Sequence, residues 1–452
     1  MEVQKEALSE NKMGVMPVNR LLLTMSIPMI ISMLIQALYN VVDSIFVSRI
    51  DEAALTAVSL VFPVQSIMIA VSAGTCVGVN AILSKRLGEK RFEEADKTAN
   101  VAVLLSVLSY LVFLLVGIFL SRLFFAVQTD DVQIVNYGAS YMSIVCTISF
   151  GLFLQMCFER LLQSTGRTIY SMFMQGTGAI INIILDPILI FGYFGMPKMG
   201  IAGAAVATVT GQIIAMLLGL IFNLKVNKEI HLRLKKMTFD LPIIKEIYRI
   251  GIPAILMQSI GSVMVFLMNK ILMGFTSTAT AVFGVYFKLQ SFVFMPIFGL
   301  SNGMVPIVAY NFGAKNRDRM MKTVKYSMIY ATALMLIGLF LAEVIPMPLL
   351  MLFDASESML AIGIPALRIL CTCFVFAGVN IISSSLFQAV GDSVYSLVMS
   401  VIRQLVVLLP AAYLLSLTGQ VNAVWLSFPI AEIAALIVSI IFLKKVTKKL
   451  NF

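Results

Sequence analysis

The sequence predicts an all-α polytopic membrane protein with about twelve transmembrane helices, arranged as two six-helix lobes that are related as a parallel repeat. Three observations predict this architecture: the composition, the spacing of the apolar runs and an internal similarity between the two halves. Of the 452 residues, 60% are hydrophobic and only 12% are charged. Soluble domains carry about 25% charged residues, so this chain lacks the polar surface that soluble domains need.

Apolar runs long enough to cross a bilayer recur along the whole chain. A spanning helix needs about 20 predominantly apolar residues. Residues 1–19 are polar and contain no separate apolar segment of the kind a secretory signal has, so we expect the first run to remain as a helix. The runs lie at roughly 21–43, 54–83, 98–120, 137–158, 170–192, 200–224, 250–273, 279–309, 323–347, 360–387, 395–415 and 421–443.

The basic residues predict the orientation. An even number of spans places both termini on one side, and the tails and loops of that side contain most of the lysines and arginines. The opposite loops carry acidic residues such as Asp130 and Asp131. Because basic loops remain cytoplasmic, we expect a multi-pass protein of a bacterial cell (inner) membrane with both termini in the cytoplasm. The net charge of +10 then meets anionic lipid headgroups, so the expected partner is the lipid bilayer and not nucleic acid.

A shift of 225 residues superposes the two halves of the chain. It places Pro28 on Pro253, Gly74 on Gly299 and Gly78 on Gly303, among other identities. Each half holds six spans, so both have the same orientation, and a substrate cavity is expected between the lobes. The predicted organisation is a cytoplasmic tail (1–20), an N-lobe (21–224), a basic cytoplasmic linker (225–242), a C-lobe (243–443) and a second cytoplasmic tail (444–452).

The segment INIILDPILIFG, residues 181–192, carries one carboxylate in an apolar run. Asn182 and Asp186 are four residues apart and therefore share one helix face. Pro187 has no N–H and cannot bond the carbonyl of Ile183. An amide, a carboxylate and a free carbonyl then gather at one level, a donor set that hard cations accept. The alternative is that Asp186 only caps or stabilises a kink.

Two further acidic residues lie in or beside apolar runs. The segment LYNVVDSIFVSR, residues 38–49, contains Asn40 and Asp43. A carboxylate near the bilayer centre costs about 2.5–3.5 kcal/mol, which a bound cation or a proton relieves; the alternative for Asp43 is a position in the outer interface. Glu159 is either a functional residue or half of an interfacial ion pair with Arg160.

The repeat does not duplicate these acidic residues. The shift places Asp43 on Met268, Asp186 on Ala411 and Glu159 on Ser384, so we expect the chemistry in the N-lobe. Lys288, close to Gln290, either faces the cavity or extends its amine to the interface. The C-lobe is instead predicted to bury cations, namely Lys270, Lys288, Arg368 and Arg403.

The sequence does not predict an enzyme. It contains no phosphate-binding G-x-x-x-x-G-K-[ST] loop, and the single histidine, His231, lies in a basic loop where we expect it to be solvated. The five cysteines lie in apolar runs and are predicted to be small buried side chains. No cofactor is expected, so energy for transport would come from an ion gradient.

Taken together, these motifs resemble the multidrug and toxic compound extrusion (MATE) family, and within it the DinF-type bacterial members. The resemblance rests on LYNVVDSIFVSR, on INIILDP, on GIAGAAVAT at residues 200–208 and on the parallel repeat, and it covers nearly the whole chain. It implies a secondary active antiporter that works by alternating access. Such a protein exports small amphipathic, cationic organic compounds in exchange for H⁺ or Na⁺, and we expect it to be a monomer.

The same resemblance implies the site. The coupling cation, H⁺ or Na⁺, would be held in the N-lobe by Asp43, Asn182 and Asp186, with Thr208 and Asn40 nearby, and a Na⁺ site in the C-lobe is not expected. The candidates for the substrate cavity are Gln36, Glu159, Lys288, Gln290 and Arg403. The alternative function is a lipid-linked oligosaccharide flippase of the same superfamily, in which Lys288 and Arg403 would meet pyrophosphate.

Overall fold

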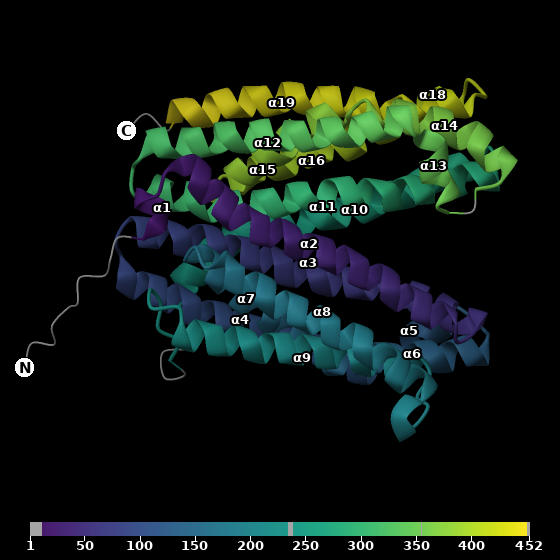
Figure 1. The fold of residues 1–452 in the computed structure, drawn as a ribbon, viewed down its shortest axis with the longest axis horizontal. Coiled ribbons are helices and arrows are strands. Elements are labelled where there is room, and N and C mark those ends of the chain that lie inside the picture. The colour runs from purple at the N-terminus through teal and green to yellow at the C-terminus, as the bar shows by residue number, and fades with distance from the viewer. Residues whose placement is uncertain (1–10, 234–237, 354, 450–452) are drawn as a thin grey trace, which may run out of the picture. The chain divides into compact units, whose positions relative to one another are not determined.

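The computed structural model describes residues 11–233, 238–353 and 355–449. Every regular element among them is helical, as the sequence predicts (Figure 1). Parts of the predicted tails and of the linker, including Lys235 and Lys236, lie outside the described residues.

The spans are longer than the apolar runs, because polar residues continue the helices at their ends. Ten helices of the described chain are long and apolar enough to cross a membrane, or up to 12 if each of two bent pairs is one span. The first half contains α2 (Val18–Ser48), α3 (Glu52–Gly88), α4 (Phe92–Phe119), α6 (Val132–Thr147), α7 (Phe150–Ser164), α8 (Thr168–Phe191) and α9 (Ile201–Lys225). The second half contains α10 (Leu241–Met273), α11 (Ser277–Gly313), α12 (Arg317–Val344), α14 (Glu357–Cys371), α15 (Phe374–Ala389), α16 (Ser393–Val401), α17 (Leu409–Ser416), α18 (Val421–Trp425) and α19 (Ser427–Lys449).

The local geometry confirms the repeat. The bent pairs are α6 with α7, at 43°, and α14 with α15, at 48°, and they occupy corresponding places in the two halves. Lys90 and Lys315, which the shift aligns, are both in the left-handed region with φ of 60° and 54°. Gly166 and Gly391 likewise have φ of 83° and 87°. The short helices are α1 (Lys12–Val15), α5 (Ser121–Ala126), α13 (Pro346–Met351) and a 3₁₀ turn at Tyr193–Gly195.

One span of the second half contains a π-helical segment, Ile402–Leu408, between α16 and α17. The N–H of Leu409 donates to the carbonyl of Gln404, five residues earlier. Pro410 follows and has no N–H to continue the ladder. Short π-helical turns inside α-helices frequently mark functional sites.

The chain divides into two compact units whose boundaries differ from those of the predicted lobes. Unit 1 contains Ile31–Gly251, and unit 2 contains Lys12–Ile30 with the chain from Ile252 onward. The beginning of α2 therefore packs within unit 2, and the beginning of α10 packs within unit 1. The predicted lobes kept each of these helices whole.

Two glycines that the repeat aligns explain why the first turns of α2 pack in unit 2 and those of α10 in unit 1. A Cβ on Gly78 of α3 would lie 2.2 Å from the backbone oxygen of Ile247, at the start of α10. A Cβ on Gly303 of α11 would lie 2.5 Å from Oγ of Ser26, at the start of α2. Both positions need glycine, because only a residue without Cβ lets the backbones approach this closely. Each unit thus holds the first turns of the helix that continues into the other unit.

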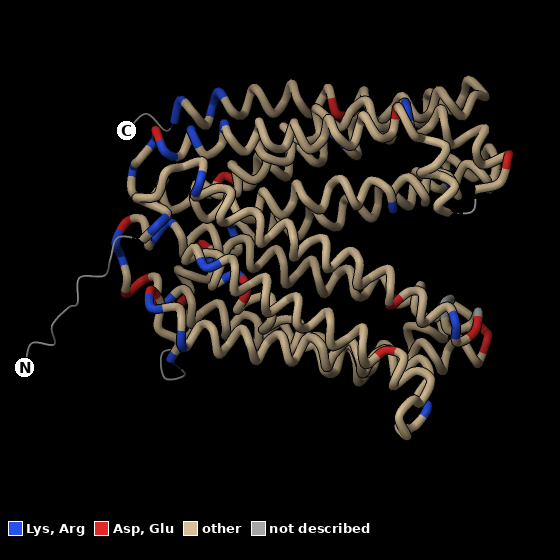
Figure 2. Tube along the Cα trace, in the orientation of Figure 1, with Lys and Arg blue, Asp and Glu red and all other residues tan. Residues whose placement is uncertain are grey.

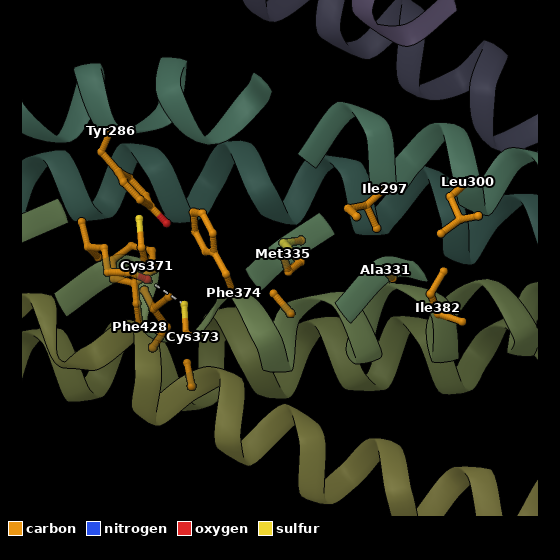
Figure 3. Packing of buried hydrophobic residues seen from close by; sticks show 14 of the residues in the cluster. Tyr286, Ile297, Leu300, Ala331, Met335, Cys371, Cys373, Phe374, Ile382 and Phe428 are labelled. Atoms are coloured by element: carbon orange, nitrogen blue, oxygen red, sulfur yellow. Dashed lines mark hydrogen bonds between the residues drawn. The ribbon is translucent and has the colours of Figure 1, made fainter. Parts of the chain in front are cut away.

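The core of unit 2 is built from α11, α12, α14, α15 and the last span. Figure 3 shows Tyr286, Cys371 and Phe428 close together in one part of this core, and Ile297, Leu300 and Ile382 in another. The rings of Phe283 and Trp425 stack with their centroids 6.1 Å apart. All five cysteines are buried and free, which confirms their predicted role as small core side chains.

Charged residues concentrate at one end of each unit (Figure 2). In unit 1 this is the end where α3 finishes and α4 begins, and in unit 2 it is the end where α19 finishes and α12 begins. The buried Arg86 of α3 is 2.7 Å from Glu246 and so fastens the start of α10 to unit 1. His231 remains 60% exposed, but its Nδ1 lies 3.3 Å from a carboxylate oxygen of Asp96.

Candidate coupling site in unit 1

Two carboxyl groups meet inside unit 1. The side chains of Asp43 on α2 and Asp186 on α8 lie close enough to interact directly. Asp186 is fully buried, and Oδ1 of each residue is buried without a donor from the described part of the chain. Since a carboxylate has no hydrogen to donate, this contact requires a proton, or a cation in its place, between the two groups.

Close packing of α8 against α9 supplies the other side of the site. The two helices run side by side (Figure 1), and a Cβ on Gly211 would lie 2.6 Å from the backbone oxygen of Gly178. The absence of side chains at these two glycines lets the backbones meet. Asn182 and Thr208, both buried, are thereby brought within hydrogen-bond distance of each other.

The Asn182 amide has two orientations. In one, its Nδ2 donates to Oγ1 of Thr208 at 3.3 Å. In the other, its Nδ2 donates to Oδ2 of Asp186 at 3.1 Å while its oxygen accepts from the Thr208 N–H at 3.0 Å. The second orientation satisfies both ends of the amide and links Thr208, Asn182 and Asp186 in one chain of hydrogen bonds.

Two tyrosines border the carboxyl pair, and the sequence did not single them out. The Tyr39 hydroxyl lies close to the side chain of Thr208 and near both carboxyl groups. The hydroxyl of Tyr141 on α6 accepts from Nε2 of Gln65 at 3.4 Å and also lies near Asp43. Tyr39 was open to prediction, because it precedes Asp43 by one helical turn on the same face.

The other candidates of unit 1 lie outside this group. Asn40 is exposed, and the structure does not bring its side chain to the carboxyl pair. Gln36 accepts a hydrogen bond of 3.2 Å from Gln175, so α2 and α8 share a second polar bridge. Glu159 is buried and accepts from Nε2 of Gln163 at 2.8 Å.

Glu159 is therefore not simply the acidic partner in an ion pair at the surface. Its neighbour Gln163 also accepts from Arg160 at 2.8 Å, so the glutamine lies between the glutamate and the arginine. The Ser171 hydroxyl donates to the backbone oxygen of Glu159 at 3.3 Å. These contacts fix Glu159 in the interior of unit 1, apart from the carboxyl pair.

Of the four cations predicted to be buried in the second half, three are exposed and one is half-buried. Lys270, Lys288 and Arg368 are exposed, because their long side chains extend away from the core. The Lys288 amine lies 5.7 Å above the ring of Phe353, and Gln290 is half-buried with Oε1 lacking a donor among the described residues. Arg403 forms an ion pair of 2.8 Å with Glu432.

Glu432 on α19 was missed, although it gave the same signal as Asp186. It is the one carboxylate in the apolar segment SFPIAEIAALIVSIIF, residues 427–442. It is buried, and Asn380 of α15 donates to its Oε2 at 2.7 Å. The second half therefore has an acidic residue of its own, and that residue is neutralised by Arg403 of the π-helical segment.

The carboxyl pair and its neighbours offer oxygen donors that a proton or a small cation could use. Among the described residues, no group of three or more His, Cys, Asp or Glu side chains lies close enough to hold a metal ion in common. Two carboxyls, one amide and one hydroxyl remain as oxygen donors, which is a set of the hard-cation type.

Comparisons with known proteins agree with this fold. The MatE family model matches residues 28–188 and again residues 253–414, so the two matches repeat the internal shift found in the sequence. The chain is 27% identical over 409 residues to the multidrug export protein MepA of Staphylococcus haemolyticus, covering 90% of this chain and 89% of that protein.

Solved structures are also similar. One, described as the outward-facing conformation of a multidrug resistance MATE family transporter of the MOP superfamily, matches with a TM-score of 0.93 and 24% identity over 99% of this chain and 100% of that chain. Another, a MOP superfamily transporter from Pyrococcus furiosus, matches with a TM-score of 0.90 and 25% identity over the same shares. Since the family model covers more than half of the residues in two consecutive copies, the chain belongs to the MatE family.

Proposed function

We propose that this protein is a secondary active multidrug efflux antiporter that exports amphipathic, cationic compounds in exchange for H⁺ or Na⁺. The contact between Asp43 and Asp186 is the observation on which the proposal rests. The naming of a relative as a multidrug export protein supports the substrate class.

The carboxyl pair gives a physical basis for coupling. Two carboxylates in contact repel each other, so the pair accepts a cation or a proton readily. With Na⁺ bound, Asn182 takes the orientation in which Nδ2 donates to Thr208 and its oxygen faces Asp186, beside the two carboxyls. With H⁺ bound, the proton bridges the pair and Nδ2 of Asn182 donates to Asp186. Emptying the site leaves buried negative charge, which favours a conformation that admits water or an organic cation.

Exchange follows if the two cations favour different conformations. A ligand shifts a conformational equilibrium only by its difference in affinity between the states. The coupling ion is small and fits the closed pair, whereas an amphipathic cation needs a larger opening. The site is complete within one chain, so we propose that a monomer suffices.

We further propose that the charged ends shown in Figure 2 face the cytoplasm, which places both termini inside the cell. Positive charge near the ends of the spans then faces the anionic inner leaflet.

Transport in proteoliposomes tests the function. The full-length protein is reconstituted, and flux of a fluorescent amphipathic cation is followed while a proton gradient or a sodium gradient is imposed separately. We expect one gradient to drive accumulation against the dye's own gradient. If the dye flux is the same with a proton gradient, with a sodium gradient and without any gradient, the proposal of coupled antiport is wrong.

The alternative function, a flippase for pyrophosphate-linked lipids, receives less support. It needs free cations in the cavity, and Arg403 is paired with Glu432 at 2.8 Å. Of the two basic candidates, only Lys288 is left without an acidic partner among the described residues.

A further inference from the structure

An open hollow lies at the charged end of unit 2, between the start of α12 and the end of α19. Its volume is about 410 Å³, within the range of about 300–1,000 Å³ typical of small-molecule sites. Its lining consists of Arg317, Ile440, Leu443, Lys444, Thr447 and Lys448. Three cations and an apolar wall thus surround one space.

The cations of this hollow are not neutralised by nearby acids. Asp318, beside Arg317, pairs instead with Lys322 at 2.7 Å, and Asp392 pairs with Lys449 at 3.0 Å. Within the described residues no ion pair joins Arg317, Lys444 or Lys448 to a carboxylate. The three positive charges therefore lack a protein counter-ion in this part of the chain.

Arg317 has one guanidinium nitrogen without a partner in the described part of the chain, and its remaining nitrogens are the ones available to the hollow. Its Nε is buried and has no hydrogen-bond acceptor among the described residues. A buried donor without a partner costs about 1–3 kcal/mol, so such groups are rare unless something else accepts from them. Arg317 is also the first residue of α12, where the helix N-terminus adds partial positive charge that favours a phosphate.

A simpler explanation covers part of this pattern. Lysines at the last turn of α19 compensate the helix dipole and follow the general bias of charge near membrane surfaces. That explanation needs neither a hollow nor a buried, unpaired guanidinium nitrogen. It leaves Arg317 and the shape of the site unexplained.

We propose that this hollow binds the phosphate of an anionic lipid headgroup in the adjacent membrane leaflet. The apolar wall favours a lipid over free phosphate. Ile440 lines the hollow and is exposed, and Ile433, Ile437 and Ile441 are exposed on the same helix toward the membrane interior. An acyl chain can follow this strip while the phosphate accepts from Arg317, Lys444 and Lys448.

The test is lipid retention by the full-length protein in detergent, measured by native mass spectrometry. Phosphatidylglycerol, phosphatidylcholine and inorganic phosphate are added in separate arms. The parent should retain phosphatidylglycerol in preference to phosphatidylcholine. A variant with Arg317→Gln, Lys444→Gln and Lys448→Gln should lose this preference, with affinity falling about fivefold for each cation removed. Excess inorganic phosphate should not displace the lipid, because it makes no apolar contacts.

A matched variant controls for total charge. Lys90→Gln, Lys225→Gln and Lys245→Gln remove three exposed cations of unit 1 that do not line the hollow, and this variant should retain the lipid as the parent does. Lys448→Gln alone, at an exposed position, serves if the triple variant fails to fold. The proposal is overturned if the hollow variants bind like the parent, if the control loses as much, or if inorganic phosphate binds alone and displaces the lipid.

Discussion

Asp43 on α2 and Asp186 on α8 bring their carboxyl groups into direct interaction inside unit 1. The two residues cannot share this contact as two bare carboxylates, because one proton or cation must lie between them to remove the repulsion. One proton or cation between the two groups would let the pair act as a single acidic unit.

Replacing either carboxyl should abolish coupled efflux. Asp43→Asn and Asp186→Asn should each leave the protein folded, and the double variant should be little worse than either single variant, because groups acting as one unit are strongly non-additive. Efflux of an amphipathic dye from cells expressing each variant measures this. Asp130→Asn, at an exposed position, is the control and should behave as the parent. Additive losses would show that the two carboxyls act independently.

Thr208→Val should weaken binding of the coupling ion. The hydroxyl touches Asn182 and Tyr39, and losing such a hydrogen bond costs about 0.5–1.5 kcal/mol, or a few-fold in the half-saturating ion concentration. Thr210→Val is the matched control, since that hydroxyl only donates to the carbonyl of Val206 in its own helix. Equal effects of the two variants would remove Thr208 from the site.

The ion pair between Arg403 and Glu432 in unit 2 should have a structural role. Removing one partner should destabilise the protein more than replacing both. Arg403→Gln leaves the buried Glu432 carboxylate without its cation, and Glu432→Gln leaves the half-buried Arg403 without its anion. Each should destabilise the protein, by less than the roughly 3–5 kcal/mol of a fully buried pair. Replacing both with apolar residues of similar size should cost much less. Arg368→Gln is the control, because the exposed pair of Arg368 with Glu343, at 3.7 Å, contributes about 0–1 kcal/mol. Denaturation in detergent gives these differences, and a fully tolerated Glu432→Gln would contradict this account.

Adding a methyl group at Gly78 or Gly303 should loosen the packing of the first turns of α10 or of α2, respectively. Gly78→Ala and Gly303→Ala each force backbone atoms apart, at a cost of about 1–3 kcal/mol. Hydrogen exchange should then rise at the start of α10 in the first variant and at the start of α2 in the second. Gly284→Ala, with no atom within 4 Å of the added carbon, should change neither. Faster hydrogen exchange in α2 of the Gly78 variant, or in α10 of the Gly303 variant, would contradict these contacts.

Labelling from outside the cell tests the proposed orientation. Cysteines introduced at Lys90 and Lys315 should be protected from an impermeant thiol reagent in intact cells, and one at Asp130 should react. The five native cysteines are buried, so the background should be low. Reaction at Lys90 and Lys315 with protection at Asp130 would place the charged ends outside.

Much of the fold could be predicted because it depends on patterns that are visible along the sequence. The apolar runs gave the spans, and the shift of 225 residues gave the repeat that Lys90 and Lys315 confirm with their shared left-handed geometry. The packing of the first turns of α2 in unit 2, and of α10 in unit 1, could not be predicted in this way. The repeat aligns Gly78 with Gly303, but it does not say which segment fills the groove beside each glycine.

The candidate site was predicted in part for the same reason. Asn182 and Asp186 share a helix face, Asp43 was recognisable as a carboxylate in an apolar run, and the resemblance to a family placed the three in one site. Tyr141 and Gln65 joined the site only through contacts between distant helices. Arg403 was misjudged because its partner, Glu432, lies on another helix, and sequence spacing alone cannot show that two such side chains meet.

The most direct test of the carboxyl pair is linkage between binding of the organic cation and release of the coupling ion. Calorimetric titration of the purified full-length protein with an amphipathic cation is performed in buffers of different ionisation enthalpy and at several sodium concentrations. The parent should release a proton on binding, or lose affinity as sodium rises, since the two cations favour different states of one site. Asp43→Asn and Asp186→Asn should lose that dependence while Asp130→Asn keeps it. Unchanged proton release or sodium dependence in both carboxyl variants would contradict the assignment of coupling to Asp43 and Asp186.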